Sequence, residues 1–103
     1  MTEVQFENYP DGKALFFIEE ANNKIAEMEV AVKSNELIAY HTEVDPAYED
    51  QGLAKKLLGV MVEHAREHNL KVVPLCRFVL IQFKRNPAEY ADLWQEEKSG
   101  YEG

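Results

Sequence analysis

Apolar and polar residues alternate along the first half of the chain in the pattern of β-strands. Between Ile25 and Lys33, apolar residues stand at every second position and are separated by two glutamates and one alanine. A period of two is typical of a sheet that has one buried and one solvated face. The same reasoning predicts strands at residues 4–7, 13–20 and 36–44. Turn-forming residues separate these strands at Tyr9-Pro10-Asp11-Gly12, Ala21-Asn22-Asn23-Lys24 and Ser34-Asn35.

The strand predicted at residues 36–44 carries polar side chains near its end. Successive side chains of a strand point to opposite faces of the sheet. Strict alternation gives one face made of Leu37, Ala39, His41 and Glu43, and a second face made of Ile38, Tyr40, Thr42 and Val44. We therefore expect His41 and Glu43 to lie together, on the same face as the two apolar residues before them.

The pattern changes its period after Asp45-Pro46. Over residues 52–68 the apolar residues recur at helical spacing, and charged residues gather on the opposite side. The apolar face consists of Leu53, Ala54, Leu57, Leu58, Met61 and Ala65. We expect this helix to begin near Asp50 or Gln51 and to stop at Asn69.

The last third of the chain predicts one strand and two short helices. Residues 71–75 are a β-branched run, and residues 77–85 favour a helix. The stretch Asn86-Pro87-Ala88-Glu89 combines an N-cap, a proline at the first helical position and a glutamate at the third, which predicts a final helix through about Trp94. Residues 98–103 are expected to form a loose tail.

This order of elements predicts a single α+β domain over residues 1–103. Its sheet is expected to be mixed and mostly antiparallel, with one strand–helix–strand unit that crosses over in the right-handed sense. The net charge of −8 argues against nucleic acid or an anionic membrane surface as a partner. No apolar run is long enough to span a bilayer, and the N-terminus does not resemble a targeting signal. A single cysteine also fits a reducing compartment, so we expect the protein to be cytoplasmic.

The turn before the main helix has two interpretations. The first N–H groups of a helix have no partner within it, and a glycine such as Gly52 lets an anion approach them closely. Lys55 would add positive charge. However, Glu49 and Asp50 place two negative charges in the same turn, and such residues commonly complement a helix dipole. The pattern alone leaves both a phosphate-binding turn and a simple turn open.

A family resemblance bears on this choice. Residues Glu49-Asp50-Gln51-Gly52-Leu53-Ala54 resemble the coenzyme A loop of the GNAT superfamily of N-acetyltransferases, whose general form is Gln/Arg-x-x-Gly-x-Gly/Ala. The flanking stretches HTEV, GLAKKLL, HNLKVVPLCRFV and NPAEYADL are similar to a branch of short GNAT-like proteins of about one hundred residues. The resemblance extends over residues 13–93. Glu49 departs from it where Gln or Arg is expected, and Asp50 where this branch often has Gly.

The resemblance implies an acetyl-CoA-dependent N-acetyltransferase that acts on a primary amine. The pyrophosphate would rest on backbone N–H groups, and the pantetheine arm would lie between the fourth and fifth strands near Glu43. Val44 would donate its N–H to the oxyanion. The implied cofactor-binding residues are Val44, Asp50, Gln51, Gly52, Leu53, Ala54 and Lys55.

Cys76, His41 and Glu43 are the candidate catalytic residues. The resemblance implies that Cys76 acts as a nucleophile or a proton carrier, whereas a lone cysteine is more commonly a small buried apolar residue. His41 and Glu43 could orient the substrate or accept its proton, or be ordinary sheet residues. An acidic chain favours a cationic acceptor. The alternative function is a non-catalytic module on the same scaffold that binds CoA, acyl-CoA or another protein.

We expect no metal site. His64 and His68 are one helical turn apart, but the zinc-protease pattern requires a glutamate directly after the first histidine, and here Glu63 precedes it. Both histidines lie near the apolar stripe, so partly buried structural roles are expected.

Overall fold

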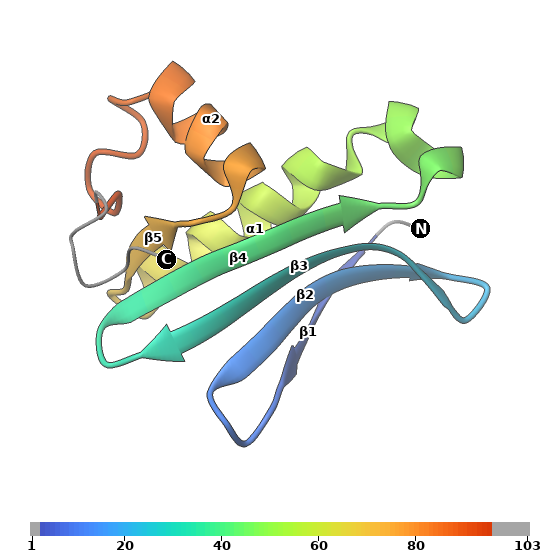
Figure 1. Ribbon diagram of the computed structural model, residues 1–103, viewed down its shortest axis with the longest axis horizontal. Helices are drawn as coiled ribbons and strands as arrows, with labels where there is room; N and C mark the ends of the chain where they lie inside the picture. Colours follow the sequence, from blue (N-terminus) through green and yellow to red (C-terminus); the bar gives the residue numbers. More distant parts are fainter. Residues whose placement is uncertain (1–2, 96–103) are drawn as a thin grey trace.

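The computed structural model describes residues 3–95, which form one five-stranded sheet with two α-helices and a 3₁₀ helix (Figure 1). The strands are β1 (Val4–Asn8), β2 (Lys13–Glu20), β3 (Asn23–Lys33), β4 (Glu36–Val44) and β5 (Lys71–Pro74), and the helices are η1 (Pro46–Gln51), α1 (Leu53–Glu67) and α2 (Arg77–Arg85). The strands lie in the order β1-β2-β3-β4-β5, and only β4 and β5 are parallel. The predicted α+β class and the helix at residues 77–85 are confirmed. The tail expected at residues 98–103 lies outside the described residues.

The main core lies between one face of the sheet and α1, which crosses behind the strands in Figure 1. Phe16, Met28 and Leu37 come from three neighbouring strands, and Leu57 and Met61 come from α1; each is at most 1% exposed. Burying one such side chain stabilises the fold by about 1.5–3 kcal/mol. Two residues of α2 join the same cluster. The helical periodicity thus identified the correct face of α1. None of the helices described here is long and apolar enough to cross a membrane.

β4 contains one residue more than β3 in the middle of their ladder. Ala39 lies opposite Val30 and His41 lies opposite Glu29, so Tyr40 is the additional residue of a β-bulge. A bulge reverses the alternation of the side chains that follow it. The prediction that His41 shares a face with Leu37 and Ala39 is therefore wrong.

After the bulge, the core face of β4 is continued by Thr42 and Val44. Thr42 pairs with Met28, which is fully buried, and Val44 pairs with a buried alanine of β3. His41 and Glu43 still share a face, as predicted, but it is the opposite face of the sheet from α1.

The parallel strands β4 and β5 diverge after a short pairing. Their register runs from Glu36 opposite Lys71 to Ala39 opposite Pro74. The last backbone hydrogen bond between the two segments runs from the Cys76 N–H to the Ala39 carbonyl at 2.7 Å. Beyond it, β4 continues to η1 while the chain turns away into α2, as Figure 1 shows. We call this divergence the fork.

The helix predicted from Pro87 to Trp94 is wrong. Asn86 ends α2 instead of starting a new helix, and its N–H donates to the Gln82 carbonyl at 3.1 Å. Residues 87–93 form turns, and Trp94 makes a parallel bridge with Val72 of β5. An eight-residue helix gains few internal hydrogen bonds for the cost of its first turn, whereas the edge of β5 offers partners directly.

Side chains hold this turn segment against the rest of the molecule. Arg66 of α1 contacts Asp92 through two hydrogen bonds, of 3.0 Å and 3.2 Å, and donates a third of 2.8 Å to the Glu89 carbonyl. Lys71 donates to the Asp92 carbonyl at 2.6 Å. These contacts raise the pKa of Arg66 and lower that of Asp92, in each case mainly through their mutual hydrogen bond.

Candidate functional site

The open edge of β4 is the first component of the site. Within residues 3–95, β5 pairs with β4 only as far as Ala39, so the stretch Tyr40–Val44 has a ladder with β3 on one side alone. Backbone N–H and C=O groups on its other side face the fork. Such an edge can pair with an extended ligand that carries amide groups.

The turn after β4 is the second component, and it differs from the prediction. Asp45 caps η1 by accepting the Ala47 N–H at 2.9 Å, and the Tyr48 N–H donates to the Asp45 carbonyl at 2.8 Å. Gly52 then adopts a left-handed conformation, with φ of 69° and ψ of 25°. This conformation interrupts the helical path, so α1 begins at Leu53 and not near Asp50.

The start of α1 presents unpaired backbone donors. The Lys56 N–H makes the first bond of the helix, to the Gly52 carbonyl at 3.2 Å. The amides of Leu53, Ala54 and Lys55 precede it and have no partner within α1. Gly52 has no side chain that could cap them. A Cβ added at Gly52 would meet no atom within 4 Å, so the approach to these amides is open.

The other predicted loop residues occupy different surroundings. Asp50 and Gln51 belong to η1, where the carbonyl three residues earlier can accept each amide. Glu49 and Asp50 are both exposed. The donors of the turn that lack a partner within a helix are therefore the amides of Leu53, Ala54 and Lys55.

Cys76 is the third component. It is 5% exposed and forms the N-cap of α2, where its side chain makes no capping hydrogen bond. Its Sγ lies 3.2 Å from the Thr42 Oγ1 across the fork. Sequence reasoning missed Thr42 because strict alternation placed it away from Ala39. Only the strand pairing reveals the bulge that brings it to the thiol.

His41 and Glu43 do not join Cys76. They lie on the opposite face of the sheet, with side chains 60% and 68% exposed, and their Nε2 and Oε1 atoms are 4.0 Å apart. The register places Glu29 opposite His41 and Glu27 opposite Glu43. The structure therefore separates the three candidate catalytic residues into a buried thiol and an exposed pair made of one histidine and one glutamate.

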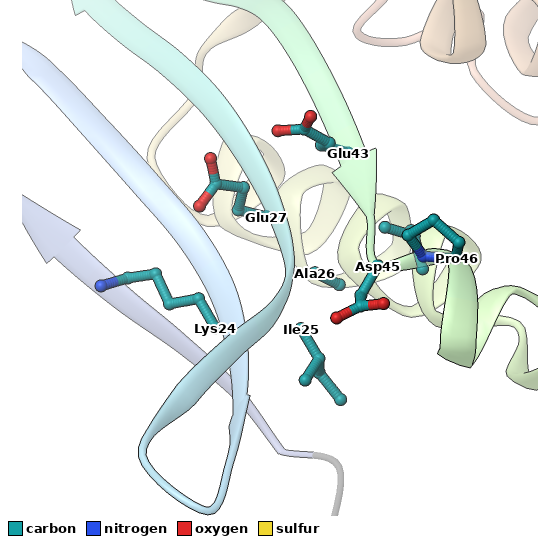
Figure 2. A pocket seen from close by; sticks show the side chains of 8 residues that line it. Lys24, Ile25, Ala26, Glu27, Glu43, Asp45 and Pro46 are labelled. Atoms are coloured by element: carbon teal, nitrogen blue, oxygen red, sulfur yellow. The ribbon is translucent and has the colours of Figure 1, made fainter.

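A hollow of about 320 Å³ adjoins Glu43. It is lined by Lys24, Ile25, Ala26 and Glu27 of β3, and by Glu43, Val44, Asp45 and Pro46 at the end of β4 (Figure 2). Glu27 and Glu43 project from neighbouring strands to the same side in Figure 2, whereas the Lys24 ammonium points away from both. Lys24 instead lies over the Phe17 ring, 4.8 Å from its centroid.

The two histidines of α1 lie far along the helix from the fork. The His64 ring packs against Phe6 and Phe16 at centroid distances of 4.8 Å and 5.5 Å, and it stacks on His68 at 4.2 Å. Partial burial lowers the pKa of His64, and the neighbouring His68 lowers it further. Across the part of the chain that is described, no three His, Cys, Asp or Glu side chains are grouped so that they could hold a metal.

Comparisons with known proteins identify the architecture. Residues 15–93 match the family model of the GCN5-related N-acetyl-transferases. The solution structure of a GCN5-like protein from Staphylococcus aureus is 32% identical, with a TM-score of 0.69. The match covers 97% of this chain and 94% of that protein.

Two more distant structures share the fold. The ribosomal-protein-S18-alanine N-acetyltransferase of Escherichia coli is 20% identical with a TM-score of 0.57, over 62% of this chain and 42% of that one. An aminoglycoside acetyltransferase from an uncultured soil metagenomic sample is 20% identical with a TM-score of 0.55, over 73% and 56%. A search of curated protein sequences found no match.

Proposed function

The chain belongs to the GCN5-related N-acetyltransferase family, and on this premise we propose that it transfers the acetyl group of acetyl-CoA to a primary amine. The observation that carries the proposal is the uncapped start of α1 behind Gly52, which follows the open edge of β4. Together these features offer hydrogen-bond donors for a diphosphate and a strand edge for the amide-containing arm of CoA.

The start of α1 would hold the pyrophosphate. The amides from Gly52 to Lys55 point out of the helix with the positive end of its dipole, and the exposed Lys55 side chain adds a cation. Glu49 and Asp50 oppose this binding. An exposed unit charge about 4 Å from another costs only about 1 kcal/mol in water, so several directed hydrogen bonds outweigh it.

The open edge of β4 would hold the pantetheine arm and the thioester. Its amides would pair with the backbone near Glu43 and Val44, and the Val44 N–H would stabilise the oxyanion that forms on the acetyl carbonyl. The arm would then lie in the fork, on the strand that carries Thr42 beside Cys76.

The reaction replaces one bond to the acetyl carbon by another. The deprotonated amine attacks the carbonyl, the C–N bond forms, the C–S bond breaks, and CoA leaves as a thiolate that takes up a proton. Cys76 can serve this reaction in two ways. It can accept the acetyl group first and pass it to the amine, or it can supply the proton to the leaving thiolate.

The exposed face of β3 and β4 favours a cationic acceptor. Glu27, Glu43 and Asp45 line the hollow beside His41, and they would attract an ammonium group before it loses its proton. His41 or Glu43 would be placed to take that proton, on the side of the sheet opposite Cys76.

Acetyl-CoA binding tests the premise of the proposal. At a concentration of acetyl-CoA about 100 times its dissociation constant, the free energy of unfolding should rise by about 2.7 kcal/mol. The amide NMR signals from Gly52 to Lys55 should move in the same titration. Unchanged stability and unmoved signals at millimolar acetyl-CoA would refute the proposal.

Turnover separates the enzyme from a non-catalytic binding module. The protein is incubated with acetyl-CoA and a panel of amines, and released CoA is quantified together with the mass of the protein. Release of CoA that depends on the amine supports the enzyme, and an acetyl group on Cys76 supports the two-step route. Binding with no CoA release for any amine would favour the module.

A further inference from the structure

We propose that Thr42 is a positioning residue for Cys76: its hydroxyl forms a hydrogen bond with the sulfur and holds it in the fork as the nucleophile of the two-step route. This inference rests on the proposed function only in assigning a reaction to Cys76. The contact itself is a property of the protein, with Oγ1 and Sγ 3.2 Å apart.

The bulge in β4 makes this contact possible. Without the additional residue Tyr40, alternation would direct His41 to the core face and Thr42 to the opposite face. With the bulge, Thr42 faces the core, and it is partly buried beside a sulfur that is 5% exposed. The fold has therefore placed a small neutral hydroxyl beside the thiol, where an unbulged strand would have placed an imidazole.

The chemistry of the two groups fixes the direction of the hydrogen bond in the reactive state. A thiol can donate or accept, but a thiolate can only accept, whereas the threonine hydroxyl rotates to donate. A donor aimed at a charged group favours the charged form. The sulfur also lies at the first residue before the nine-residue helix α2, whose dipole favours negative charge there.

The other candidate residues cannot take this role from where they lie. His41 and Glu43 are exposed on the opposite face of the sheet and pair across β3 with Glu29 and Glu27. We therefore assign His41 and Glu43 to the acceptor amine and Thr42 to the thiol.

Alkylation of the single cysteine tests the proposal without acetyl-CoA. The rate constant for iodoacetamide is measured across a range of pH for the wild-type protein and for Thr42→Val, which keeps the shape of the side chain but removes the hydroxyl. The plateau at high pH reports access to the sulfur, and the midpoint of the profile reports its ionisation. We expect the midpoint of Thr42→Val to lie about half to one pH unit above that of the wild type.

Matched variants complete the experiment. Thr42→Ser keeps the hydroxyl and should keep the wild-type midpoint, and Thr42→Ala replaces Thr42→Val if the latter does not fold by circular dichroism. In the wild type, the Thr42 methyl NMR signal should titrate with the same midpoint as alkylation. An unshifted midpoint in Thr42→Val or Thr42→Ala, an equal shift in Thr42→Ser, or a Thr42 methyl signal that does not titrate would each overturn the proposal.

Turnover adds a separate result. In an active enzyme, Thr42→Val should lower kcat about tenfold while KM for acetyl-CoA stays the same, because the hydroxyl acts on the sulfur and not on the bound cofactor. If the protein transfers no acetyl group, the alkylation and NMR results still decide whether Thr42 controls the thiol.

Discussion

The helix α1 follows β4 and the helix α2 follows β5, the two strands of the fork, and neither helix has a side-chain cap. The residues directly before the two helices differ in conformation and in burial. α1 starts behind Gly52, which is exposed and left-handed, whereas α2 starts behind Cys76, which is buried and extended. The first start leaves three backbone amides without a partner in the helix, and an anion can satisfy them. The second is enclosed by the core and presents one sulfur. We propose that the uncapped start of α1 serves cofactor binding and that the uncapped start of α2 serves chemistry.

Removing the sulfur should separate these two roles most clearly. For Cys76→Ala we expect turnover to fall about 100-fold or more, because a group that carries the acetyl or a proton is lost. The dissociation constant of acetyl-CoA, measured by calorimetry, should stay the same, since the start of α1 is intact. Wild-type turnover in Cys76→Ala would show that Cys76 takes no part in the reaction. Only the proposed binding role of the start of α1 would then remain.

Changing Gly52 should have the opposite effect. Valine at φ of 69° is strained by about 1–3 kcal/mol, and relief of this strain would displace the start of α1 together with its amides. For Gly52→Val we expect acetyl-CoA to bind about tenfold more weakly, with much of kcat retained at saturation.

Gly59 supplies the matched control for this variant. It lies in the middle of α1, where a Cβ would meet no atom within 4 Å. Gly59→Ala should stabilise the protein by about 0.5–1 kcal/mol and leave acetyl-CoA affinity unchanged. Equal affinities for Gly52→Val and Gly59→Ala would show that the cofactor does not bind at the start of α1.

The two acids of the turn should have a smaller effect. For the double variant Glu49→Gln/Asp50→Asn we expect acetyl-CoA to bind about two- to fivefold more tightly at low salt, because a repulsion near the pyrophosphate is removed. The gain should shrink at high salt, where exposed charges are screened. Glu63→Gln makes a charge change of the same kind on the exposed side of α1, far from its start. Because Glu63→Gln removes one charge and the double variant removes two, a gain in Glu63→Gln that is about half as large in free energy would mean that only net charge matters.

The smallest effect is expected for His64, near the opposite end of α1, and it concerns the free energy of unfolding. Its pKa is lowered in the folded state, first by burial and then by His68. The unfolded chain therefore binds a proton more readily, so the free energy of unfolding should decrease as the pH falls below about 6.5, towards the lower pKa of the folded state. Urea unfolding measured between about pH 7.5 and about pH 5.5 should show this decrease, and His64→Gln should reduce it. A decrease of unchanged size in His64→Gln would assign it to other groups.

Sequence patterns identified the elements of the fold but not the pairing that forms the site. The apolar stripe of α1 and the alternation of β3 follow from local periodicity, so both were predictable. The bulge at Tyr40 was not, because an additional residue leaves the apolar pattern of β4 unchanged and is defined only against its partner strand. That one residue separates His41 from Cys76 and brings Thr42 to it.

Two other differences have the same kind of cause. Gly52 was recognised as a loop residue, but its left-handed conformation, which delays the start of α1 to Leu53, depends on the 3₁₀ turn before it. The capping signal at Asn86-Pro87-Ala88-Glu89 predicted a helix that competes with pairing to β5. Tertiary contacts decided that competition, through the bonds of Arg66 and Val72.

The short pairing of residues 93–95 with β5 also determines how much of the outer edge of the sheet is free to pair with another chain. The Val72 N–H donates to the Leu93 carbonyl at 2.7 Å, and the Gln95 N–H donates to the Val72 carbonyl at 2.8 Å. A bare strand margin is a template on which further copies can assemble into fibrils. Residues 93–95 thus cover part of the outer edge of β5, and removal of the chain from Leu93 onward would leave the Val72 N–H and carbonyl open to pairing with another strand.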